Sequence, residues 1–312
     1  MENLMIATAA VVPFIVYILM GAIAKKAGAV KEDFLKQLNS VAFKVFFPFI
    51  MFDNLYDADF STLNGSFYVP FAVVATLCLI ALALLIVPRL EKENARRGVI
   101  IQAVFRSNAV LYAIPLVTSV FGDAGAAKAS ILVAFVVPLY NIVSVIVLEY
   151  YRGGRVSAGK MLLNILKNPL IKGAIAGAIF NLLPVTMPVP LVKPIAQLSA
   201  MATPLALFVL GGTLHLSDVR KNSRVLAAGS LIKLVFVPAV MAFIMYRLSF
   251  DPVELFVVFC TFATPVAAAS YPMAAGMGGD ADLAGEYVMV TTLLSIVTIF
   301  TWILVLKNFG CM

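Results

Sequence analysis

The sequence from Phe105 to Asp123, FRSNAVLYAIPLVTSVFGD, is apolar, is long enough to lie in a bilayer and is interrupted by Pro115. A second stretch from Thr264 to Asp280, TPVAAASYPMAAGMGGD, has the same layout around Pro272. In both stretches a Gly-Asp pair begins seven residues after the proline. Proline inside a helix removes one backbone hydrogen bond and clashes with the preceding turn. We therefore expect two interrupted helices, with breaks at Pro115 and Pro272.

The environment of such breaks carries functional information. In hydrocarbon, the carbonyl groups that a break frees need new partners, so breaks persist where they are buried or line a cavity. Paired interrupted helices in corresponding halves of a chain point to the substrate site of a transporter. The two stretches therefore predict a secondary transporter whose site lies between them.

Composition places the chain in a membrane. Of its 312 residues 62% are hydrophobic and 12% charged, and the mean hydropathy is +1.01. Soluble domains are about 45–50% apolar and about 25% charged. The formal net charge of +7 sits mainly in short loops between apolar runs, which indicates membrane topology rather than a nucleic-acid partner.

The sequence contains no motif for a disulfide framework, a metal site, nucleotide binding or catalysis. The three cysteines, Cys78, Cys260 and Cys311, have no spacing of a disulfide framework or a metal site. We find no nucleotide-binding loop and no nucleophile–base arrangement. The sequence therefore predicts no metal, no cofactor and no enzymatic activity.

Apolar windows of about 20 residues predict ten spanning helices. The expected ranges are Leu4–Ala24, Leu38–Tyr56, Phe67–Val87, Gly98–Phe121, Ala126–Tyr151, Leu162–Leu183, Leu191–Leu214, Val225–Tyr246, Pro252–Met277 and Leu283–Leu306.

The loop charges predict the orientation of these helices. The first, third, fifth and seventh loops carry clusters of Lys and Arg, such as Lys25-Lys26 and Arg96-Arg97, whereas the loops between them carry few. Basic loops face the cytoplasm. We expect a multi-pass protein of the plasma membrane (the bacterial inner membrane) with both termini outside. The first apolar run follows no basic segment, so we interpret it as a spanning helix rather than a cleaved signal.

The chain also repeats itself. Pro48 precedes Pro115 by 67 positions, and Pro204 precedes Pro272 by 68. A unit of five helices inverts when it is repeated, because an odd number of crossings switches sides. We therefore expect an all-α fold of two inverted repeats with crossed broken helices four and nine, an arrangement that supports alternating access. The two expected repeats are residues 1–155 and 156–312.

The candidate site follows from this repeat. Broken helices expose half-helix N-termini, whose free N–H groups favour anions. The repeat sets Ser107 and Asn108 opposite Thr264 and Pro265. An asparagine both donates and accepts hydrogen bonds, so Asn108 is our first candidate for contact with an anion. The alternative is that Asn108 caps or bridges a neighbouring helix.

Several basic side chains lie within or beside the apolar runs. Arg106 either attracts the anion or, as we favour, extends to the cytoplasmic surface. Lys44, four residues before Pro48, raises the same question. We expect Lys233 to extend to the surface as well. His215, the single histidine, either relays protons or simply lies at the interface, and we favour the interface.

Residues that flank the breaks complete the list of candidates. Tyr112, Ser270 and Tyr271 either line the site or pack in the core. The two prolines of the breaks, Pro115 and Pro272, belong to the same proposed site. The pattern of Gly173 and Gly177, GxxxG, predicts a close contact between helices, either within the chain or between protomers.

These motifs resemble those of the auxin efflux carrier family, in particular its bacterial branch of malonate and malate permease-like proteins. The resemblance covers nearly the whole chain, and its signatures are 108–116 (NAVLYAIPL), Pro265, Gly279-Asp280 and 291–295 (TTLLS). It implies the crossed-helix fold of bile-acid symporters and sodium/proton antiporters. It also implies a scaffold of helices one, two, six and seven, a transport domain of helices three to five and eight to ten that moves as an elevator, and a homodimer.

The resemblance assigns roles to two residues. An asparagine at the position of Asn108 contacts the carboxylate region of the substrate in the plant carriers, and a lysine matching Lys44 works with an acid on helix three. The range Phe67–Val87 contains no acid. We expect a carrier of a small organic anion, either a mono- or dicarboxylate or an auxin-like acid. Two alternatives stay open, a receptor that binds in the same crevice and a sodium-coupled symporter, although neither break carries the acids of a cation site.

Overall fold

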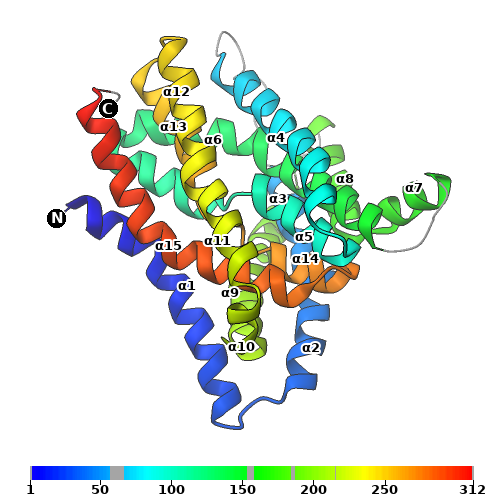
Figure 1. Ribbon diagram of the computed structural model, residues 1–312. Helices are drawn as coiled ribbons and strands as arrows, with labels where there is room; N and C mark the ends of the chain where they lie inside the picture. The colour runs from blue at the N-terminus through cyan, green and yellow to red at the C-terminus, as the bar shows by residue number, and fades with distance from the viewer. Residues whose placement is uncertain (1, 57–66, 153–157, 184–186, 215, 311–312) are drawn as a thin grey trace.

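The computed structural model describes residues 2–56, 67–152, 158–183, 187–214 and 216–310. These residues form an all-helical protein, and they contain no β-strand. Figure 1 shows the helices packed around one another, with α7 projecting at one edge of the molecule.

The first half of the chain runs from α1 to α6. Its elements are α1 (Glu2–Lys26), α2 (Glu32–Val41), the π-helical turn η1 (Ala42–Phe46), α3 (Phe47–Tyr56), α4 (Tyr68–Leu90), α5 (Asn94–Phe105) and α6 (Ala109–Tyr151).

The second half of the chain is divided into more elements. These are α7 (Ala158–Lys167), α8 (Pro169–Leu182), α9 (Val189–Thr213), α10 (Leu216–Lys221), α11 (Ser223–Leu231), the π-helical turn η3 (Ile232–Phe236), α12 (Val237–Arg247), α13 (Pro252–Ala263), α14 (Ser270–Met277) and α15 (Ala281–Asn308).

Five helical stretches of the described chain are long and apolar enough to cross a membrane, as judged by length and composition. They are Tyr68–Leu90, Ala109–Tyr151, Val189–Thr213, Ser223–Arg247 and Ala281–Asn308. Two shorter apolar helices, Pro169–Leu182 and Pro252–Ala263, lie inside other expected ranges. The structure thus supports a multi-pass membrane protein in which several of the expected spans are divided into shorter helices.

The first break does not lie at the predicted proline. Pro115 sits inside α6, and the interruption comes earlier, at Arg106–Asn108, where both Arg106 and Asn108 leave helical geometry. Ser and Asn side chains compete with the helix for backbone hydrogen bonds, which favours an interruption at Ser107-Asn108. The prediction of a broken helix is therefore confirmed, but the prediction that Pro115 breaks it is wrong.

The second break is displaced in the same direction. Residues Thr264–Ala269 separate α13 from α14, and Pro272 is the third residue of α14. A proline in the first turn of a helix interrupts nothing, because the N–H groups there have no helical acceptor. Pro265 causes this break, since the residue before a proline avoids helical geometry and Thr264 is extended (φ −77°, ψ 154°).

The two Gly-Asp segments mark corresponding helix ends. Gly122 has a positive φ of 62° and divides α6 into two helices. Gly278, with φ 78°, ends α14 in a left-handed conformation. Glycine adopts this conformation without steric cost. Asp280 then begins α15, because its side chain accepts a hydrogen bond from the N–H of Leu283 at 2.9 Å.

Two glycines allow the helices α8 and α3 to approach closely. A side chain added at Gly173 or Gly177 of α8 would overlap the carbonyl oxygens of Pro48 and Phe52, so α8 rests directly on α3. The GxxxG pattern therefore serves packing within the chain. Small residues allow such approach in membrane proteins, where dispersion contacts replace the hydrophobic effect between helices.

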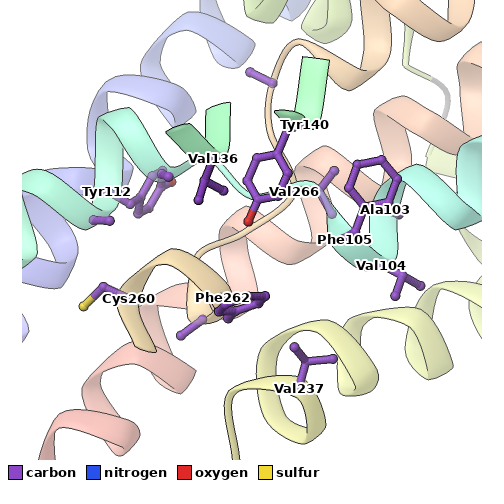
Figure 2. Packing of buried hydrophobic residues seen from close by; sticks show 14 of the residues in the cluster. Ala103, Val104, Phe105, Tyr112, Val136, Tyr140, Val237, Cys260, Phe262 and Val266 are labelled. Atoms are coloured by element: carbon purple, nitrogen blue, oxygen red, sulfur yellow. The ribbon is translucent and has the colours of Figure 1, made fainter. Parts of the chain in front are cut away.

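The helices fall into two groups by their packing. Helices α1, α2, α3, α8 and α9 pack mainly on one another, and so do α4, α5, α6 and α11 to α15. A large apolar cluster fills the second group and includes Phe105, Tyr140 and Val266, which Figure 2 shows around the breaks. The rings of Phe105 and Tyr140 lie 6.0 Å apart.

Candidate functional site

The two breaks meet inside the protein. Ser107 and Val266 form an isolated antiparallel bridge, and the N–H of Asn108 donates to the carbonyl of Pro265 at 2.9 Å. The N–H of Val266 donates in turn to the Thr291 hydroxyl at 3.1 Å. Each interrupted helix therefore supplies hydrogen-bond partners for the other, as interruptions within a membrane require.

A cavity of about 730 Å³ lies beside the first break and opens between the two groups of helices. Its walls come from α1, α3 and α9 on one side, and from α6 and both breaks on the other. The polar residues that line it are Tyr17, Asp53, Asn54, Arg106, Ser107, Asn108, Tyr140, Asn141, Ser199 and Thr203.

Two half-helix N-termini border this cavity. The N–H groups of Ala109, Val110 and Leu111 begin α6 and have no acceptor among the described residues. Residues 267–269, which precede α14, line the same cavity. Unpaired N–H groups, as at the start of α6, and the positive end of a helix dipole favour negatively charged groups.

Arg106 is buried at the first break, with 3% of its surface exposed. Its Nη2 donates to Oδ1 of Asn141 at 2.6 Å, and its Nη1 lies 2.6 Å from the sulfur of Met273. No carboxylate of the described chain forms an ion pair with it. The expectation that Arg106 extends to the surface is therefore wrong, because neighbouring side chains hold the guanidinium beside the cavity. Buried charges are normally paired, so a guanidinium without a carboxylate partner is suited to pair with an anion bound in the cavity.

Asn108 precedes α6 and is 8% exposed. Its side chain makes no capping bond to the helix, and its Nδ2 has no hydrogen-bond partner among the described residues. The alternative in which Asn108 caps the helix is therefore excluded. A buried amide donor without a partner, in the wall of a cavity, is well suited to a ligand oxygen.

The other candidate residues separate into those that line the cavity and those that lie behind it. Ser107 and Pro115 line it together with Asn108. Pro265 contributes its carbonyl to the contact between the breaks. Thr264 and Ser270 are buried near that contact, without a hydrogen-bond partner for their hydroxyls in the described part of the chain.

Tyr112, Tyr271 and Pro272 lie outside the lining of the cavity. The Tyr112 ring packs against Phe14, with ring centroids 5.2 Å apart. The Tyr271 hydroxyl shares a hydrogen bond of 2.8 Å with Thr213, which connects α14 to α9. These side chains pack around the site rather than face its ligand.

Lys44 and His215 were the other basic candidates. Lys44 is exposed in η1 and does not line it. His215 lies outside the described residues. The acids at the helix ends have structural roles instead, since Asp280 pairs with Arg96 at 3.3 Å.

The sequence reasoning missed two residues, Lys233 and Asn141. Lys233 was expected to extend to the surface, but it is fully buried and donates to the hydroxyl of Ser107. Its position near the centre of the expected range Val225–Tyr246 was the available signal, because a lysine so far from both ends has no short path to water. Asn141 was not among the candidates; it is a polar residue within the expected range Ala126–Tyr151, and the structure gives it the role of orienting Arg106.

Comparison with known proteins identifies the family. The family model described as "Membrane transport protein" matches residues 6–156 and 153–303. The chain belongs to this membrane transport protein family. This confirms the resemblance to auxin efflux carriers. A relative from the archaeon Methanothermobacter thermautotrophicus, named "Uncharacterized transporter", is 26% identical over 301 residues, which cover 96% of this chain and 98% of that protein.

Proposed function

We propose that this protein is a secondary transporter of a small organic anion in the plasma membrane. The observation that carries the proposal is the cavity between the helix groups, where two half-helix N-termini and the buried, unpaired Arg106 converge. Its volume of about 730 Å³ is sufficient for an aliphatic or aromatic carboxylate, since ligand sites commonly measure about 300–1,000 Å³.

The proposed movement is that of an elevator. The group α1, α2, α3, α8 and α9 would be the scaffold, and the group that contains both breaks would be the transport domain. The position of the cavity between the two groups supports this division, because sliding one group past the other would expose the same site to either side. The proposal includes ten spans as two inverted repeats, residues 1–155 and 156–312, with both termini outside.

The anion is held mainly by charge and backbone. Arg106 provides the positive charge, the first N–H groups of α6 bind the carboxylate oxygens, and Asn108 donates through Nδ2. Each of these donors is buried or lines the cavity, so the low dielectric strengthens its interaction with an anion. The remaining walls set the size and shape of the substrate.

The test compares binding and transport in matched variants. A thermal-shift panel of acetate, phenylacetate, indole-3-acetate, malonate and malate would identify a ligand of the detergent-solubilised protein. We expect Arg106→Gln to reduce binding and liposome uptake of that ligand by about tenfold to a hundredfold, because a hydrogen bond to a charged group contributes about 1.5–3 kcal/mol. Asn108→Ala should weaken both by about tenfold.

Lys44→Gln is the control, since Lys44 is exposed and outside the cavity. Normal uptake by Arg106→Gln with impaired uptake by Lys44→Gln would contradict the proposed site. Ligand binding without counterflow across vesicles would favour the receptor alternative. Uptake that stops when sodium is omitted would favour the symporter alternative, although the described residues contain no cluster of three acidic, His or Cys side chains that could hold a metal ion.

The homodimer implied by the family resemblance is part of the same proposal. Light scattering of the detergent-solubilised protein, with the mass of the detergent subtracted, would distinguish it from a monomer.

A further inference from the structure

Lys233 is the second buried cation at the breaks, and the anion site described above does not use it. It lies in the π-helical turn η3 and has 0% of its surface exposed. Its Nζ donates to the Ser107 hydroxyl, and Ser107 lines the cavity. Lys233 is therefore separated from a bound anion by a single small side chain.

No acidic side chain of the described chain balances this amine. The helices packed against η3 are α5, α11, α12, α13 and α15. Their buried charged or titratable groups are Arg106, at the end of α5, Cys260, Glu286 and Tyr287. Glu286 accepts from Asn222 and Tyr287 donates to the Val225 carbonyl, whereas Arg106 binds Asn141 and Met273. None of these groups has a hydrogen bond to Lys233 in the described residues.

The remaining titratable group near this contact is Tyr140 on α6, whose phenol adjoins Ser107 and Thr76. A neutral phenol provides no counter-charge for an ammonium group. Among the groups named here, Arg106 is a second cation, Tyr140 is neutral and Glu286 binds Asn222, so none of them is hydrogen-bonded to Lys233 as a counter-charge in the described residues.

The charge of a buried amine depends on what is bound near it. An ammonium without a counter-charge is costly to bury, and an anion close by repays much of that cost. Binding of the anion and protonation of the amine must then favour each other, because coupling between two ligands is reciprocal.

We propose that Lys233 couples the anion to a proton. When the anion enters the cavity, the neutral amine Nζ takes up one proton from water. When the anion leaves on the other side of the membrane, Nζ releases that proton there. This inference rests on the proposed function and adds the coupling ion to it: the carrier moves one proton with each anion.

The two buried cations thus have different tasks. A guanidinium keeps its proton in proteins, so Arg106 attracts the anion in every state of the cycle. A buried lysine changes its charge readily, so Lys233 can respond to the anion. Arg106 also lies at the C-terminal end of α5, where the negative end of the helix dipole stabilises its positive charge.

The experiment counts the protons that accompany binding. Phenylacetate or indole-3-acetate, both of which stay ionised near neutral pH, would be titrated calorimetrically into the detergent-solubilised protein in buffers of different ionisation enthalpy. We expect the wild type to take up as much as about one proton per anion at alkaline pH. Its affinity should fall by up to about tenfold per pH unit in that range.

Three variants separate coupling from a structural role. Lys233→Arg fixes the positive charge, so it should keep its affinity, take up no proton and lose the pH dependence. Lys233→Met fixes a neutral side chain, so it should bind more weakly, again without proton uptake. Lys44→Met is the matched control: Lys44 lies in the other π-helical turn but is exposed, and we expect wild-type proton uptake.

Proton uptake that persists in Lys233→Arg would overturn the proposal, as would the absence of proton uptake in the wild type at every pH. Anion binding without proton uptake would leave the proposed function standing and reduce Lys233 to a fixed structural cation. The absence of binding by wild-type protein would contradict the proposed function itself.

Discussion

Asp53 is the one acidic residue among those of the described chain that line the cavity. It lies on α3, lines the cavity opposite the breaks, and has no ion pair or hydrogen bond to its carboxylate among the described residues. A ligand that brings one negative charge can bind at Arg106 and the helix N-termini and turn its uncharged end toward Asp53. A second negative charge on the ligand would face this carboxylate.

We therefore expect the protein to prefer monoanions to dianions. Asp53→Asn should increase the affinity for malonate by about fivefold to tenfold, because two like charges across a solvated cavity repel each other by about 1 kcal/mol. The affinity for acetate should change little. Calorimetric titration of both acids into both proteins would measure the effect, and equal gains for the two acids would show that Asp53 does not discriminate charge.

Side-chain chemistry at the site was only partly predictable from the sequence. Asn108 and Ser107 were predicted because the repeat brought them to the centre of the molecule. The burial of Arg106 and Lys233 was not predicted. A long side chain in an apolar segment can reach either the surface or the interior, and its hydrogen-bond partners determine which. Asn141 holds Arg106 inside and Ser107 holds Lys233 inside, and each partner comes from another segment of the chain.

At the scale of elements, prolines had different consequences in different places. Pro265 breaks a helix, whereas Pro115 and Pro272 lie inside helices. Pro238 follows the π-helical turn η3 and lacks the N–H that the carbonyl of Leu234 would otherwise accept. The indole N–H of Trp302 donates to that carbonyl at 2.9 Å, so a neighbouring helix repairs the interruption.

The existence of two corresponding interrupted helices was therefore predictable, but their exact breakpoints were not. The sequence shows where the prolines are. Whether a helix breaks at a proline depends on whether a donor is available for the carbonyl group that the proline leaves without its N–H partner. That donor belongs to another element, as Trp302 shows for Pro238. The predicted repeat was more informative than any single proline.

A cluster around Arg96 joins four helix ends, namely the end of α4 and the starts of α5, α11 and α15. Arg96 at the start of α5 pairs with Glu91 at 3.0 Å and with Asp280 at 3.3 Å, and it donates to Asn222. Partial burial opposes the ionisation of Glu91, but backbone N–H donors and Arg96 outweigh it and hold the pKa of this carboxyl below its usual range. The stability that this cluster provides is therefore present at neutral pH and is lost as the pH falls through that lowered pKa.

Close packing of α8 on α3 gives a prediction about stability. Gly177→Ala should lower the stability by about 1–3 kcal/mol, because the added methyl group overlaps the carbonyl of Phe52 and forces the helices apart. Gly159→Ala on α7 is the matched control, since nothing lies near its position and alanine favours the helix. Thermal unfolding in one detergent would compare them, and equal melting temperatures would contradict the tight contact.

At the scale of the whole molecule, the proposed elevator requires the two helix groups to slide past each other. The turn η1 packs mainly on α2, α3 and α9 of the first group, whereas α14 belongs to the second. A β-carbon at Gly276 of α14 would lie 2.7 Å from the ring of Phe43 in η1. Gly98 of α5 and Tyr151 of α6 belong to the same group, and a β-carbon at Gly98 would lie 3.5 Å from that of Tyr151.

Cross-linking of these two pairs distinguishes movement from rigidity. The variant with Phe43→Cys and Gly276→Cys, bridged by a short thiol-specific reagent, should lose liposome uptake and regain it on reduction. The variant with Gly98→Cys and Tyr151→Cys has a spacing that suits a disulfide, and uptake should continue after oxidation. Both would be made in a background with Cys78→Ser, because Cys78 is exposed. Continued uptake with the first pair bridged would contradict the proposed sliding.

The bridge between Ser107 and Val266 has a consequence for how such carriers diversify. Its hydrogen bonds join main-chain atoms, so no substitution of a neighbouring side chain removes them directly. The main-chain contact that holds the two breaks together is therefore less exposed to mutation than the side chains of Arg106 and Asn108. The walls contributed by α1, α3 and α9 are ordinary side chains that can be exchanged one at a time. If the proposed function is correct, a lineage with this architecture can change which acid it carries while the contact between the two breaks persists.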